Sequence, residues 1–112
     1  MTYAELFSAI KNELIQADVS DIKEHLAWQF NVTGEASGIF YIEIKDGNVS
    51  IEPYEYYDRD VIFIADADTF LNIANGTLDP IKAVTKKKLR FEGDTNKALR
   101  LNDLIKDKNK KK

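Results

Sequence analysis

The sequence predicts an α+β fold, with a five-stranded, mainly antiparallel sheet that helices cover on one face. Three observations lead to this prediction. Apolar residues recur at helical spacing near both ends, alternating apolar and polar residues fill the middle, and Gly, Pro and Asp residues separate these segments. With 112 residues, 44% of them hydrophobic, the chain is long enough for one domain with a modest core. We expect this domain to span residues 1–105, followed by a lysine-rich tail at 106–112.

The first half of the chain predicts one helix and three strands. Thr2 and Glu5 form a capping box ahead of an apolar stripe, which predicts a helix over residues 3–17. Asp46-Gly47 predicts a type I′ hairpin turn between two strands. Pro53 lacks a backbone N–H, so the strand that contains it either lies at an edge or ends there. The alternating patterns place these three strands at residues 26–33, 39–45 and 49–54.

The second half predicts a buried strand, two helices, a short strand and a final helix. Residues 61–65 are apolar on both faces, so this strand should lie inside the sheet. Asp66 or Asp68 caps the next helix. Asp79-Pro80 starts a short helix to about residue 84, because Pro fits the first helical position. A strand at 89–92 and a helix capped by Asp94 complete the chain, and the apolar stripe of that helix is Ala98, Leu101, Leu104 and Ile105.

Charge is distributed unevenly along the chain. Residues 1–80 carry 4 basic and 15 acidic side chains, whereas residues 81–112 carry 12 basic and 4 acidic ones. Each Lys or Arg near an anionic membrane contributes about 1 kcal/mol of attraction, so the basic end predicts transient contact with an anionic membrane surface. The alternative is a solvated tail, because a terminal lysine run is most simply a solubilising end.

The sequence offers few candidate residues for catalysis or metal binding. The chain has no cysteine, one histidine, His25, and no Gly-x-Ser-x-Gly pattern. The carboxylates that could bind a metal lack the spacing of a calcium loop; they are Asp58, Asp60, Asp66 and Asp68. We therefore expect a protein that is not an enzyme and that has no metal or cofactor. The aromatic residues lie apart from the basic ones, which argues against nucleic-acid binding.

The sequence also predicts a compartment. No stretch approaches 18 consecutive apolar residues, and the first five residues lack the basic and apolar pattern of a signal peptide. Together with the absence of cysteine, this pattern predicts a cytoplasmic protein.

The order and spacing of six segments carry a family resemblance. The segments are residues 28–34 (WQFNVTG), 38–44 (GIFYIEI), 60–64 (DVIFI), 76–80 (GTLDP), 88–94 (KLRFEGD) and 98–101 (ALRL). Within a match over roughly residues 5–105, they resemble the sterol carrier protein-2 (SCP2) family. The family usually has Gly in the turn before the last strand. This chain has Lys87 there, which argues against a tight turn.

The resemblance implies an apolar tunnel between sheet and helices. In the SCP2 family this space holds a fatty acid, acyl-CoA, sterol or similar ligand, and the C-terminal helix partly gates it. Apolar composition alone does not separate such a tunnel from a filled core, because both use the same residue types. The residues expected to line it are Phe30, Phe40, Ile42, Phe63, Phe70, Ile81, Val84, Phe91, Leu101, Leu104 and Ile105.

The main functional hypothesis is therefore non-catalytic binding, and transfer, of an apolar lipid. One alternative is an accessory domain with a vestigial cavity that interacts with an unidentified protein. Another is a domain that presents acyl substrates to a partner enzyme.

The last helix is the expected lid of the tunnel. Its apolar stripe is only about two turns long, and a helix that depends on packing for its stability opens more readily than a sheet. The lysines after it could draw it to a membrane, whereas the alternative is a static helix with an inert tail.

Overall fold

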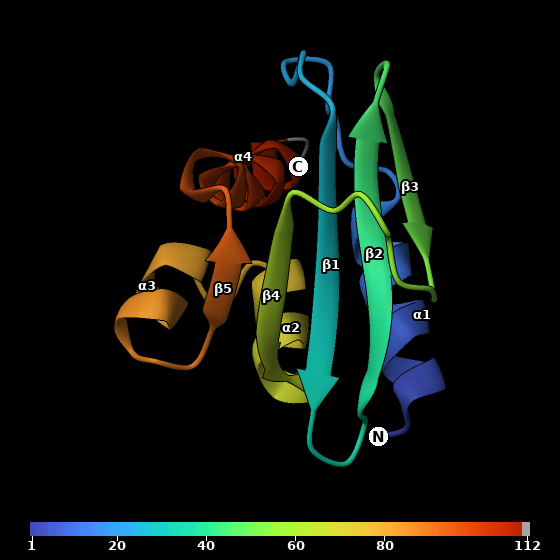
Figure 1. Ribbon diagram of the computed structural model, residues 1–112, viewed down its shortest axis with the longest axis vertical. Coiled ribbons are helices and arrows are strands. Elements are labelled where there is room, and N and C mark those ends of the chain that lie inside the picture. Colours follow the sequence, from blue (N-terminus) through green and yellow to red (C-terminus); the bar gives the residue numbers. More distant parts are fainter. Residues whose placement is uncertain (111–112) are drawn as a thin grey trace.

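The five strands form one sheet in the order β3-β2-β1-β4-β5, and the helices lie on one side of it (Figure 1). The structure is a computed structural model that describes the backbone of residues 1–110 and the side chains of residues 1–105. The predicted α+β fold is confirmed, with five strands and helices on one face. The strands are β1 (Leu26–Thr33), β2 (Gly38–Lys45), β3 (Asn48–Glu52), β4 (Val61–Asp66) and β5 (Arg90–Gly93).

The sheet is mixed, because β1 pairs with β4 in parallel while the other three strand pairs are antiparallel. As its apolar pattern predicted, β4 lies inside the sheet, between β1 and β5. The predicted hairpin joins β2 to β3, and both of its turn residues have positive φ, +52° at Asp46 and +79° at Gly47, as a type I′ turn requires. The edge strand β3 ends at Glu52, directly before Pro53.

Side-chain caps define where the helices begin. Thr2 and Glu5 form the predicted capping box, and Asp66, Asp79 and Asp94 each accept a backbone N–H in the first turn of the helix that follows. The helices are α1 (Tyr3–Leu14), α2 (Ala67–Ala74), α3 (Pro80–Thr85) and α4 (Thr95–Lys110).

Two of the helices differ in length from the prediction. Helix α1 ends at Leu14 and not at residue 17, because the backbone N–H of Ala17 donates to Leu14 O at 3.0 Å and closes a tighter turn there. Helix α4 runs to Lys110, so it continues past its apolar stripe and includes residues 106–110 of the segment predicted as a tail. The last two lysines of that segment lie outside the described residues.

The core between sheet and helices is built around Phe30 of β1. Its ring stacks on Phe40 of β2 with centroids 4.8 Å apart and on Phe63 of β4 at 5.2 Å. Phe70 of α2 meets the same ring edge-on at 5.4 Å. Such pairs contribute about 0.5–1.5 kcal/mol each beyond the area they bury. This cluster therefore ties three strands and one helix together at the centre of the molecule.

A connector, residues 53–60, crosses the opposite face of the sheet on its way from β3 to β4 (Figure 1). It covers Gln29, whose side chain is buried and accepts the backbone N–H of Tyr56 at 3.2 Å. The Tyr56 hydroxyl donates to the Glu43 carboxylate at 2.6 Å, and His25 Nε2 lies 2.7 Å from the same oxygen. The hydrogen bond from Tyr56 is the main cause that lowers the pKa of Glu43, and the bond to Glu43 raises the pKa of Tyr56 to about 12.

We expect Tyr56→Phe to lower the free energy of unfolding at neutral pH by about 1 kcal/mol, because it removes a hydrogen bond to a charged group. Since the folded-state pKa of Tyr56 is raised, this stabilisation is complete below its ordinary value of 10.0 and is lost as pH rises toward about 12. The pKa of Glu43 is lowered, so the stabilisation also fades as pH falls below that residue's ordinary value of 4.5.

Urea unfolding of both proteins across this pH range measures the effect of Tyr56→Phe. Tyr57→Phe is the matched control, because Tyr57 is 93% exposed. A stability gap between wild type and Tyr56→Phe that stays constant above pH 10 would contradict the assignment.

The turn before β5 is tight, although Lys87 had argued against this. Lys87 has a φ of +63°, and it follows the C-cap residue of α3, Lys86. The backbone N–H of Lys87 donates to Val84 O at 3.0 Å, and those of Lys88 and Leu89 donate to Ala83 O. The residue that ends a helix in the left-handed conformation is usually Gly. The prediction was wrong because the backbone hydrogen bonds hold the turn despite the side chain.

Replacing Lys87 by Gly is expected to stabilise the fold by about 0.5–1 kcal/mol. The left-handed conformation costs a non-Gly residue about 1–2 kcal/mol, and the entropy that Gly gains on unfolding offsets only part of the relief. Lys86→Gly is the matched control, because φ at Lys86 is −83° and Gly there brings only the entropic loss. Chemical denaturation should therefore move the two midpoints in opposite directions, and equal destabilisation would refute the strain at Lys87.

Candidate functional site

Most of the residues predicted to line a tunnel surround a small gap between the sheet and α1, α2 and α4. Its volume is about 10 Å³, close to the minimum of about 10–15 Å³ that one water needs. The aromatic cluster around Phe30 therefore fills this space almost completely. The gap is lined by Ile10, Leu14, Phe30, Phe40, Ile42, Phe70, Ile73, Ala74, Leu101 and Ile105.

A second apolar space lies at the surface, where α3 and α4 meet β5. This groove has a volume of about 30 Å³, and its rim is exposed, with 47% of Ile81, 37% of Val84 and 50% of Leu99 accessible to solvent. Its floor includes Phe63, Leu89 and Phe91. Three exposed apolar side chains around one groove are unusual for a surface that stays in water.

The structure thus divides the predicted lining residues into two groups. Ile81, Val84, Phe63 and Phe91 belong to the groove, and the others belong to the gap, except Leu104, which is fully buried and lines neither. Sequence reasoning missed Leu99, because it lies outside the apolar stripe of α4.

One aromatic pair joins the linings of the two spaces. Phe63 lines the groove, Phe30 lines the gap, and their rings stack at 5.2 Å. Pockets for small molecules usually enclose roughly 300–1,000 Å³, so neither space holds a lipid chain in the conformation described.

The start of α4 is tied to the sheet by side-chain hydrogen bonds. Trp28 Nε1 donates to Lys97 O at 3.0 Å. The Asp60 carboxylate accepts from Lys97 Nζ at 3.0 Å and from the backbone N–H of Ala27 at 2.9 Å. The bond to Asp60 is also the main cause that raises the pKa of Lys97. Arg100 adds an ion pair with Glu24, with Nε and Oε1 2.7 Å apart.

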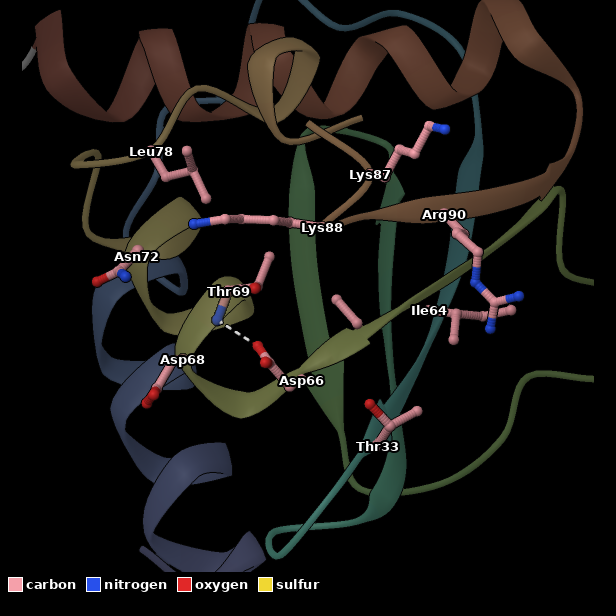
Figure 2. Close-up of a pocket in the computed structure, with 11 residues that line it drawn as sticks. Thr33, Ile64, Asp66, Asp68, Thr69, Asn72, Leu78, Lys87, Lys88 and Arg90 are labelled. Atoms are coloured by element: carbon pink, nitrogen blue, oxygen red, sulfur yellow. Dashed lines mark hydrogen bonds between the residues drawn. The ribbon is translucent and has the colours of Figure 1, made fainter. Parts of the chain in front are cut away.

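A separate polar cleft of about 620 Å³ lies at the end of β4 (Figure 2). Its walls come from β4, the start of α2, the loop before α3 and the turn before β5. Three cations line it, Lys87, Lys88 and Arg90, together with Asp66, whose Oδ1 accepts the Thr69 backbone N–H at 2.9 Å. Hydrogen bonds from the side chain and from the backbone of Thr69 lower the pKa of Asp66.

The single histidine lies away from both apolar spaces. His25 precedes β1 and contacts Glu43 on the sheet face that the connector crosses, at an exposed position. Among the described residues, no group of three or more His, Asp or Glu side chains is placed to hold a metal ion. None of the described helices is both long enough and apolar enough to cross a membrane.

A comparison of the sequence with protein-family models identifies the domain. The model of the SCP-2 sterol transfer family matches residues 2–106. The chain belongs to this family. The match covers the gap, the groove and the attachment of α4, so these features lie within the SCP-2 domain.

Proteins of different lengths resemble this SCP-2 domain. Hydroxysteroid dehydrogenase-like protein 2 of Xenopus tropicalis is 28% identical over 108 residues, which cover 96% of this chain but 25% of the relative. The chain thus spans about a quarter of that protein's length. The solution structure of palmitated SCP2L2 from Aedes aegypti has a TM-score of 0.68 at 19% identity, covering 94% of this chain and 95% of that one.

The fold also occurs as part of a larger enzyme. A structure of the sec-alkylsulfatase Pisa1 from Pseudomonas sp. matches with a TM-score of 0.68 and 17% identity, over 81% of this chain and 14% of the sulfatase. The SCP-2 fold is therefore found both alone and as a minor portion of longer chains.

Proposed function

We propose that this chain binds an apolar lipid, such as a fatty acid, acyl-CoA or sterol, between the sheet and the helices and transfers it without catalysing a reaction. The observation that carries the proposal is a pair of apolar spaces beside the sheet, one lined by Phe30 and the other by Phe63, whose rings stack on each other. Family membership supports it, and so does the palmitate carried by the related Aedes aegypti protein.

The energetics favour such a ligand. Each methylene removed from water contributes about 0.8 kcal/mol, so a long chain can offset the cost of displacing packed rings. The exposed rim of Ile81, Val84 and Leu99 provides an apolar route from the surface to the interior. Selectivity should be loose, because an apolar site distinguishes one methylene by only about 1–3 kcal/mol.

Native mass spectrometry of the purified protein, before and after delipidation and after incubation with palmitate, tests the proposal. We expect a mass increment of one lipid that delipidation removes and palmitate restores. A protein that keeps its unliganded mass with palmitate, stearoyl-CoA and cholesterol alike would refute lipid binding and favour the accessory-domain alternative.

A second candidate function is presentation of an acyl or steroid substrate to an enzyme. The observation that favours it is the match to one quarter of a hydroxysteroid dehydrogenase-like protein. Lipid transfer between vesicles distinguishes the two functions, because a carrier speeds transfer by itself, whereas a presenting domain binds lipid but speeds transfer little without its enzyme.

A further inference from the structure

We propose that the polar cleft beside α2 binds the phosphate group of a phosphate-bearing ligand. The proposal goes beyond lipid binding in the core and does not depend on it. The cleft's volume of about 620 Å³ lies within the roughly 300–1,000 Å³ typical of small-molecule sites. Its position is also separate, because none of its lining residues lines the apolar gap or the groove.

Three cations line this cleft within four residues of sequence. Lys87 and Lys88 lie in the turn before β5, and Arg90 is the first residue of β5. All three are exposed, and none of them forms an ion pair with another described residue. Figure 2 shows the Lys88 side chain reaching toward α2, while Lys87 and Arg90 project from the side of β5. Their charges are therefore available to an anion.

Two carboxylates line the cleft with the three cations, so a net positive charge remains. Asp66 already accepts the Thr69 backbone N–H and caps α2. The Asp68 side chain points away from Lys87 and Arg90 in Figure 2. The Thr33 hydroxyl and the Asn72 amide also line the cleft, and both are neutral hydrogen-bond donors. An anion held by the cations on the β5 side can therefore lie apart from Asp68.

The backbone at Lys87 gives an independent reason to assign a role to this side chain. A φ of +63° favours Gly, yet the chain has a lysine there and tolerates the strained conformation. Non-Gly residues in such conformations cluster at functional sites. The substitution adds a third cation to a cleft that Lys88 and Arg90 already line.

The chemistry of these cations favours phosphate. A guanidinium presents a planar fork of donors that matches two phosphate oxygens, and an ammonium binds a phosphate as a point charge. A single carboxylate offers two oxygens and one negative charge, so it would leave part of the charge of three cations without a partner. A phosphate monoester or pyrophosphate offers more charge and three or more oxygens. Such a group can come from a soluble phosphate or from a lipid headgroup.

Isothermal titration with inorganic pyrophosphate tests the soluble source, and sedimentation with vesicles of phosphatidylcholine containing phosphatidic acid tests the headgroup source. The variants are Lys88→Gln/Arg90→Gln and Lys87→Gly, and the control is Lys23→Gln/Lys45→Gln, which removes two exposed cations elsewhere. We expect saturable binding of at least one probe, weakened about tenfold or more by the cleft double variant, because each charge-assisted hydrogen bond carries a large share of affinity. The control variant should bind as wild type does.

Lys87→Gly separates a binding role from a structural one. We expect it to weaken binding of the same probe about threefold or more while the fold becomes no less stable, because it removes a charge and relieves the backbone. Absence of binding to both probes would overturn the proposal. So would equal losses in the cleft variant and the control, which would indicate attraction by overall charge only.

Discussion

Phe63→Trp is expected to weaken binding of a fluorescent acyl probe by about tenfold, and Leu101→Trp should do the same. Phe63 forms the floor of the groove and stacks on Phe30, and Leu101 of α4 lines the gap on the other side of that pair. A larger ring at either position occupies volume that the lipid must enter. Overpacking costs about 1–3 kcal/mol, and a further cost of this size that falls on the complex alone corresponds to about tenfold or more in affinity.

The control for this pair is Ile44→Trp. Ile44 is fully buried on β2 but lines neither apolar space, so the substitution overpacks the core without filling the lipid route. All three variants should lose a similar 1–3 kcal/mol of stability in urea unfolding. Only Phe63→Trp and Leu101→Trp should lose probe affinity. Unchanged binding in both would place the lipid elsewhere, and an equal loss in Ile44→Trp would make the effect one of general destabilisation.

Local sequence signals predicted the elements of the fold well. Capping residues such as Thr2 and Asp79 act on backbone groups within three residues, so a short pattern is enough to locate them. The turn at Asp46-Gly47 is equally local. The doubly apolar pattern of residues 61–65 correctly placed β4 inside the sheet, because only an interior strand has both faces covered.

The site was harder to predict, because it depends on contacts between distant segments. Ile81 and Leu99 form one rim only because α3 packs against α4, which no periodicity within either helix reveals. The polar cleft likewise combines Thr33 of β1 with Lys88, more than fifty residues later. The closure of the core is also a tertiary result, since it rests on the ring of Phe30 meeting three others.

Asp60 is the residue whose loss should most affect the attachment of α4. In Asp60→Ala the backbone N–H of the buried Ala27 loses its side-chain acceptor and Lys97 loses its ion-pair partner. Leaving a buried donor unsatisfied costs about 1–3 kcal/mol, so we expect the free energy of unfolding to fall by about 2–3 kcal/mol. Asp60→Asn should cost less, because its amide oxygen still accepts the Ala27 N–H. Asp58→Ala, at an exposed position nearby, should stay within about 0.5 kcal/mol of wild type.

The same variants test how α4 can act as a lid. Trp28 is the only tryptophan, it is fully buried, and its indole donates to Lys97 in the first turn of α4. Its emission therefore reports on whether this end of the helix leaves the sheet. We expect Asp60→Ala to shift the native emission to longer wavelength. The wild-type protein should keep its emission when the acyl probe binds, because the Asp60 attachment holds the start of α4 while Leu104 and Ile105 move. If probe binding shifts the wild-type emission as far as Asp60→Ala does, the whole helix leaves the sheet and the attachment does not act as its hinge.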